Sequence, residues 1–318
     1  MRTRITDLLG IRHPIVQGGL QHLALPRLCA AVSNAGALGQ ITAAAFETPE
    51  ELRAALDETR SLTSNPFGVN FALGHRGLGG HLAASLEAGI RIFSFTGGNP
   101  EPMFRLLSGR DVCTLVLVAA ARQAQKADSL GADAVIAVGY EAGGHLGRDD
   151  VGTLVLIPRV VDAVSIPVIA GGGIGDGRGL AAALALGAEG IEMGTRFVAT
   201  EECQAHRAYK QALIEAKETD TVVIERSIGR PGRVLRGPWP DQILALETEG
   251  ATLEQLLPMI GGEANFRAAR EGKLEEGFVW AGQITGLIAD APPVAELVER
   301  MVSEAEIAAT RLGTLLMR

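Results

Sequence analysis

Short apolar runs alternate with segments of helical hydrophobic spacing through the first two thirds of the chain. Strands are predicted at 14–17, 37–41, 67–71, 90–95, 112–118, 134–138, 167–170 and 190–193. Helices are predicted between them at 26–34, 48–60, 81–88, 102–107, 121–130, 153–164 and 178–186. Runs that are apolar throughout are typical of parallel strands buried on both faces, and a repeat of about 20–30 residues fits βα units. The pattern predicts an α/β protein with a closed (β/α)8 TIM barrel, and an open doubly wound sheet is the alternative.

The regular alternation of predicted strands and helices ends after residue 197. Helices are predicted at 201–217, 252–257, 266–271, 278–288 and 293–316, with an extended segment at 221–227 and a lead-in at 1–13. We interpret 1–199 and 276–318 as the barrel. Residues 200–275 are then an inserted, mainly helical subdomain over the C-terminal face of the barrel, where they can serve as a lid or a substrate subdomain.

Composition limits the classes of function. The chain has 318 residues, of which 47% are hydrophobic, 4% are aromatic, and the net charge is −8. An acidic chain with few aromatic residues is a poor partner for nucleic acid. No apolar run reaches the roughly 18 residues of a membrane helix, and the first residues lack the apolar core of a signal peptide, so we expect a cytoplasmic protein. The three cysteines lie far apart in the sequence, and no His, Cys or carboxylate residues have the spacing of metal ligands. We therefore predict no disulfide bond and no metal site.

Glycine-rich turns follow the last predicted strands. Gly171, Gly172, Gly173, Gly175 and Gly177 allow the backbone to approach an anion closely, and they lead into a helix whose first N–H groups attract negative charge. The next strand ends in a second such turn, at 193–196. At the last two strands of a barrel, these turns predict a phosphate site.

The turn after the sixth strand carries a histidine in a glycine context. His145 follows Gly143 and Gly144, and at this place it can donate a hydrogen bond or move a proton near neutral pH. Glu141 is either a general base or an ordinary loop carboxylate. His22 and His75 follow strand ends, and each could line the pocket.

Seven segments resemble one family of flavin-dependent barrels. They read PIVQGGLQ (14–21), AAVSNAGALG (30–39), PFGVNF (66–71), GADAVIAVGYEAGGHLG (131–147), PVIAGGGIGDG (167–177), GAEGIEMGTRF (187–197) and WAGQITGLI (280–288). In this order they are similar to the nitronate monooxygenases, formerly 2-nitropropane dioxygenases, and to related quinone reductases and enoyl-ACP reductases. The resemblance covers essentially the whole chain.

The resemblance implies an FMN-binding barrel with particular contacts. Gly19 and Leu20 would lie near the isoalloxazine ring, which Asn70 would contact from the third strand. His145 matches the histidine with the catalytic or substrate-polarising role. The other implied cofactor contacts are Gly144, Ala170, Gly172, Gly173, Met193, Gly194, Thr195 and Gln283, with the phosphate held at Gly172, Gly173, Gly194 and Thr195.

Three functions stay open at this point. The first is oxidation of alkyl nitronates with molecular oxygen. The alternative is an FMN enzyme that uses NADH or NADPH to reduce an enoyl thioester or a quinone, and a non-catalytic flavin-binding protein is the third. The apolar fifth strand and the basic loop at 226–236 favour the reductase, whereas Val138 stands where enoyl reductases have a carboxylate. We expect a small-molecule substrate and allow for a homodimer.

Overall fold

Eight parallel strands follow one another around a closed barrel in this computed structural model, which describes residues 1–74 and 77–316. The strands are β1 (Ile15–Gln17), β2 (Gly39–Thr42), β3 (Phe67–Ala72), β4 (Ile92–Thr96), β5 (Cys113–Val118), β6 (Ala134–Val138), β8 (Val168–Gly171) and β9 (Gly190–Met193). Their order is β1-β9-β8-β6-β5-β4-β3-β2, and a parallel bridge from Val16 to Leu38 joins the two ends. The predicted (β/α)8 barrel is therefore confirmed, and the open sheet is wrong.

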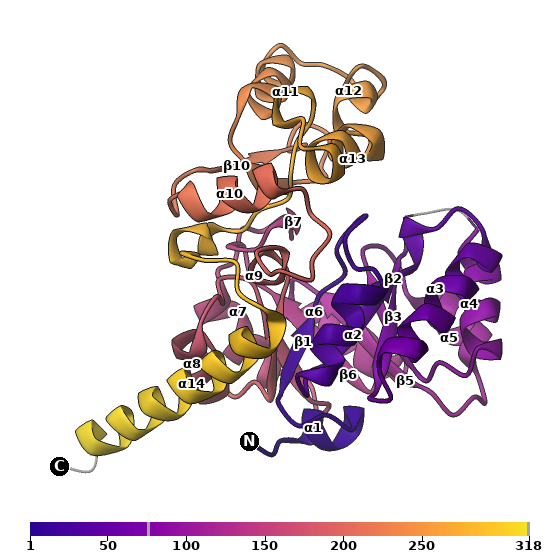
Figure 1. Cartoon of the computed structure of the whole chain (residues 1–318), viewed down its shortest axis with the longest axis vertical. Helices are drawn as coiled ribbons and strands as arrows, with labels where there is room; N and C mark the ends of the chain where they lie inside the picture. Colours follow the sequence, from indigo (N-terminus) through magenta and orange to yellow (C-terminus); the bar gives the residue numbers. More distant parts are fainter. Residues whose placement is uncertain (75–76, 317–318) are drawn as a thin grey trace.

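Helices surround the strands, as Figure 1 shows. They are α2 (Pro26–Asn34), α3 (Pro49–Leu62), α4 (Leu78–Glu87), α5 (Glu101–Leu107), α6 (Ala121–Ser129), α7 (Thr153–Val161), α8 (Gly177–Ala185), the short η1 (Ala43–Ala45) and α9 (Thr195–Val198), and α14 (Val294–Leu316). Local signals set several of their starts. Thr48 caps α3 by accepting a hydrogen bond from the Glu51 N–H at 3.2 Å, and Glu51 completes the capping box.

The N-terminal end of the barrel is closed by a helix that the sequence pattern did not predict. Residues expected as a lead-in contain α1 (Arg4–Leu9), which starts at a capping box between Thr3 and Thr6. Its Ile5 and Leu9 are buried in one apolar cluster with barrel residues that include Ile169. The opposite, C-terminal end is thus the one that can receive a ligand.

The inserted segment lies over that C-terminal end (Figure 1). It contains α10 (Arg207–Glu215), α11 (Pro238–Thr248), α12 (Leu253–Ile260), α13 (Gly262–Glu271), η2 (Leu274–Glu276) and the hairpin β10 (Thr221–Ile224) and β11 (Gly232–Leu235). The two-residue strand β7 (Gly144–His145) from the barrel pairs with β11, so the subdomain also has a three-stranded sheet.

The segment 278–288 is not the predicted helix. Trp280 forms an antiparallel bridge with Val234, and the Leu235 N–H bonds to the Val279 carbonyl at 3.0 Å. Only the 3-10 turn η3 (Gln283–Leu287) follows. This stretch is therefore apolar because it is buried between the two parts of the fold, and not because it forms an amphipathic helix.

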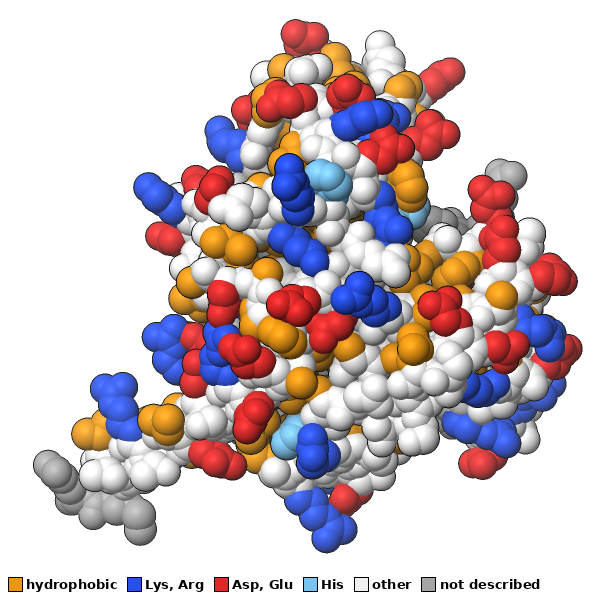
Figure 2. All heavy atoms as spheres, in the orientation of Figure 1, with side chains coloured by type: hydrophobic (Ala, Val, Ile, Leu, Met, Phe, Trp, Pro, Cys, Tyr) orange, Lys and Arg blue, Asp and Glu red, His pale blue; other side chains and the backbone are white. Residues whose placement is uncertain are grey.

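The visible surface carries acidic and basic side chains interspersed with one another (Figure 2). The described part of the chain contains no helix that is both long and apolar enough to cross a bilayer.

Candidate active site at the C-terminal end of the barrel

Three distant segments meet at the C-terminal ends of β6, β8 and β9. The Gln283 N–H bonds to the Glu141 carbonyl at 2.9 Å, and the Gly282 N–H bonds to the Thr195 hydroxyl at 3.0 Å. A Cβ on Gly143 would lie only 2.6 Å from the Gly282 nitrogen. The structure thus brings Thr195, Gln283 and the loop that carries His145 to one place.

The turn after β8 is a bare backbone surface. Gly172 and Gly173 have φ of 83° and 70°, a conformation that glycine adopts most easily. A Cβ on Gly172 would lie 2.8 Å from the Gly139 carbonyl oxygen, so a side chain does not fit. The Thr153 hydroxyl oxygen, which lies 3.0 Å from the Gly172 carbonyl oxygen, packs beside the turn.

One part of the predicted anion site is wrong. The Asp176 carboxylate caps α8 and accepts the N–H groups of Arg178 and Gly179 at 3.0 and 3.2 Å. Because a carboxylate already occupies that terminus, α8 does not offer its first N–H groups to a ligand. The available backbone is that of the two glycine turns.

The loop after β1 packs against Asn70 on β3. A Cβ on Gly19 would overlap the Asn70 side chain, and Leu20 lies against Gly194. Asn70 is 2% exposed and donates to the Ser94 hydroxyl at 2.9 Å, which in turn donates to Gln40 Oε1 at 2.5 Å. This chain of buried polar groups fixes the orientation of the amide under the loop.

His145 lies where the barrel meets the subdomain. Its strand β7 pairs Gly144 with Arg233 and His145 with Gly232. The His145 ring lies 5.0 Å from the ring of Trp280, whose indole N–H reaches Gln21 Oε1 at 3.4 Å. Sequence reasoning missed Trp280, although the WAGQ segment begins with it.

Two predicted cofactor contacts have side chains that point elsewhere. Ala170 and Met193 are 0% and 2% exposed and belong to the core packed between the barrel and its helices. At these positions only the main chain can meet a ligand.

Glu192 is a site residue that the sequence reasoning missed. It is 8% exposed, and its Oε1 is buried with no hydrogen-bond partner in the described residues. A Cβ on Gly18 would lie 3.2 Å from its carboxyl carbon. Burial raises the pKa of this carboxyl to about 7. The available signal was a carboxylate inside the apolar run GIEM.

Glu141 has a structural task. Its carboxylate accepts the Thr153 N–H at 2.9 Å and the Thr153 hydroxyl at 2.9 Å. It thereby satisfies the start of α7, whose N-cap position is the side-chain-less Gly152.

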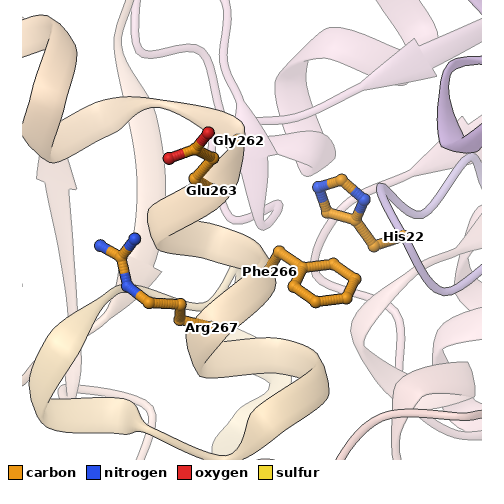
Figure 3. A pocket seen from close by; sticks show the side chains of 5 residues that line it. All are labelled: His22, Gly262, Glu263, Phe266 and Arg267. Carbon is orange, nitrogen blue, oxygen red and sulfur yellow. The ribbon is translucent and has the colours of Figure 1, made fainter. Parts of the chain in front are cut away.

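A cleft opens beside the loop after β1. One part, of about 530 Å³, is lined by residues 43–47, Leu78, His81, His22 and Phe266, and another, of about 330 Å³, continues along α13. The His22 and Phe266 rings meet edge to face, with their centroids 5.3 Å apart. Figure 3 shows both side chains with the other residues that line this pocket. His22 therefore lines a pocket, which the sequence had left open as one of two alternatives, while His75 lies outside the described residues.

Comparison with known proteins agrees with this arrangement. A family model described as "Nitronate monooxygenase" matches residues 2–304. The solved structure of FabK from Thermotoga maritima is 42% identical, covers 99% of both chains and has a TM-score of 0.92. The "(3aS,4S,5R,7aS)-5-hydroxy-7a-methyl-1-oxo-octahydro-1H-indene-4-carboxyl-CoA dehydrogenase" of Mycobacterium tuberculosis is 36% identical, covering 96% of both chains. A "Probable nitronate monooxygenase" of Staphylococcus saprophyticus is 32% identical, covering 96% of this chain and 98% of its own.

The described residues contain no group of three or more His, Cys, Asp and Glu side chains placed to hold a metal ion.

Proposed function

The chain belongs to the nitronate monooxygenase family and is an oxidoreductase, and we propose that it uses FMN to oxidise alkyl nitronates with molecular oxygen. One observation carries this proposal. The loop with His145, the glycine turn at 172–173 and the turn at 194–195 come together at the C-terminal end of a barrel that matches the family from residue 2 to 304.

The residues present fit a nucleotide cofactor. Gly172, Gly173, Gly194 and Thr195 would hold the phosphate through backbone N–H groups and one hydroxyl. Gly19, Leu20 and the buried amide of Asn70 would lie against the ring, and the unpartnered Glu192 oxygen fits a polar ligand group. The remaining contacts would come from Gly144, Gln283 and the main chain of Ala170 and Met193. The barrel, residues 1–199 and 276–318, would then bind the cofactor, and the inserted subdomain, residues 200–275, would cover the substrate.

His145 would act on the substrate. Bound FMN supplies the electron-accepting and oxygen-reactive centre. The imidazole, held by β7 and by the Trp280 ring, would donate a hydrogen bond to the nitro oxygens of the anionic substrate. The cleft beside His22 and Phe266 gives a small molecule a way in.

A second function has support of its own. The 42% identity to FabK and the similarity to a CoA-thioester dehydrogenase favour an FMN enzyme that reduces an enoyl thioester with NADH or NADPH. The basic loop at 226–236 supports the reductase less than its composition suggests, because its arginines are paired with carboxylates. Arg226 contacts Asp150 at 3.0 Å, and Arg230 and Arg236 each lie 3.9 Å from a carboxylate.

Anaerobic stopped-flow absorbance separates the two functions. The purified protein is mixed with propionate nitronate or propane nitronate and, separately, with NADH or NADPH. Bleaching of the flavin band by nitronate alone supports the monooxygenase, and bleaching by a pyridine nucleotide alone refutes it in favour of the reductase. A protein that cannot be loaded with FMN would refute both.

His145 has its own test. His145→Ala should keep FMN bound and lose most turnover, because general acid–base or hydrogen-bonding groups contribute about 10²–10⁴-fold. His206→Ala, at the N-cap of α10, is the comparison variant; it removes the hydrogen bond from the Ala208 N–H at 3.2 Å but lies outside the candidate site, so it should retain turnover. Unchanged turnover in His145→Ala would remove the imidazole from the mechanism.

A further inference from the structure

A buried carboxyl group faces the mouth of the barrel and has no role in proton transfer in the mechanism above. Glu192 stands on β9 opposite Gly171 of β8 and Val16 of β1. Its neighbours Ile191 and Met193 pack outward toward the helices, so the alternation of the strand directs Glu192 into the barrel. It is the residue immediately before Met193 and the phosphate turn.

Two glycines lie beside this carboxyl. Gly18 and Gly171 flank it, and no described residue gives a hydrogen bond to Oε1. An unpaired buried carboxylate is costly, so the group either takes up a proton or meets a ligand. The burial that raises its pKa makes proton uptake possible near neutral pH.

Other titratable groups on the adjoining elements have partners of their own. Glu141 binds Thr153, and Arg196 donates to Asp290 at 2.8 Å. His145 lies against Trp280 on the subdomain side. Glu192 is therefore a group whose charge can respond to a change of charge at the barrel mouth.

We propose that Glu192 is a proton-accepting group of the active site, which takes up a proton when the cofactor is reduced. The inference rests on the proposed binding of FMN. Bound FMN that accepted two electrons with one proton would carry one additional negative charge. The Glu192 carboxylate then takes a second proton from solvent and becomes the neutral acid, so that two electrons enter with two protons.

The sign of the effect follows from electrostatics. A carboxylate beside the cofactor opposes the added negative charge, so the pKa of Glu192 is higher with reduced than with oxidised cofactor. Between these two pKa values the protein binds one additional proton on reduction. Each pH unit then changes the two-electron equilibrium constant by an additional tenfold, or about 30 mV.

The test compares midpoint potentials of the FMN-loaded protein and Glu192→Gln. Both are titrated with dithionite against a reference dye, from about pH 5 to about pH 9, two units on each side of the pKa of about 7. The wild-type potential should fall by about 30 mV more per pH unit than that of Glu192→Gln within the window, and run parallel outside it. Glu299→Gln, which changes an exposed carboxylate on α14, should follow the wild type.

Parallel lines for wild type and Glu192→Gln over the whole range would overturn the proposal. If Glu192→Gln does not fold, infrared difference spectra of the unmodified protein decide the question. Reduction should create a carboxylic C=O band that shifts in D₂O, and its absence would refute proton uptake. Failure to bind FMN would refute the proposed function as well, whereas FMN binding with parallel potentials refutes only the role of Glu192.

Discussion

Replacing Gly172 by alanine tests whether the turn after β8 binds the phosphate. Gly172 has φ of 83°, and its backbone packs so closely on Gly139 that an added Cβ would lie 2.8 Å from a carbonyl oxygen. The turn must therefore shift. A shifted turn presents its N–H groups in different directions, and FMN should bind less tightly.

Two contributions set the size of the effect. The left-handed conformation costs an L-residue about 1–2 kcal/mol, and relief of the close contact adds about 1–3 kcal/mol. We expect Gly172→Ala to lower the free energy of unfolding of the apoprotein by about 2–5 kcal/mol. Loss of one charge-assisted hydrogen bond, worth about 1.5–3 kcal/mol, should weaken FMN binding by roughly 10–150-fold.

Gly250 provides a matched control. It has φ of 82°, but nothing lies within 4 Å of an added Cβ. Gly250→Ala should therefore cost only the conformational part and leave FMN affinity unchanged. Urea unfolding of the apoproteins and quenching of FMN fluorescence give the two quantities. Equal FMN affinity for wild type and Gly172→Ala, with a stability loss no larger than in Gly250→Ala, would refute the assigned phosphate turn.

Three further predictions concern neighbouring groups. Burial raises the pKa of Glu225 to about 7, above its unfolded value, so this carboxyl lowers the free energy of unfolding as pH rises from about 4.5 to 7. Glu225→Gln should remove this pH dependence. In urea titrations at pH 8, it should raise the free energy of unfolding by on the order of 2 kcal/mol. Asp176→Ala should lower stability by about 1 kcal/mol through loss of the cap on α8, and unchanged FMN affinity would support the exclusion of that helix from the anion site. Trp280→Ala removes the ring beside His145 and should lower kcat, whereas Trp280→Phe should retain most of it; equal kcat for Trp280→Ala and wild type would contradict the contact.

The strands were predictable because their local signals agree with one another. Most are short and largely apolar, and some of the helices between them begin at a recognisable cap, as α3 does at Thr48. Closure of the barrel could not be derived locally. Closure depends on β1, which pairs with β9 on one side and is bridged to Leu38, just before β2, on the other. An open sheet built from the same units would have the same hydrophobic pattern.

The errors share a physical cause. Apolar residues record burial, and burial arises from packing as well as from a helix or strand period. The stretch 278–288 is apolar because it lies between subdomain and barrel, and α1 was missed because six residues hold too few turns to show a period. Glu192 was missed because its strand is otherwise apolar, so that its inward direction appears only once the register of β9 is known.

In the proposed function, the position of His145 separates the substrate side of the site from the cofactor side. The glycine turns belong to the barrel alone, whereas His145 is hydrogen-bonded through β7 to the hairpin of the subdomain. Tyr209 of α10 also donates to the Trp280 carbonyl, so the ring beside His145 is fixed from the same part of the fold. A shift of residues 200–275 would therefore move the imidazole and leave the phosphate turns in place. Substrate contacts in the subdomain can thus control the approach of His145 without changing how tightly the barrel holds its ligand.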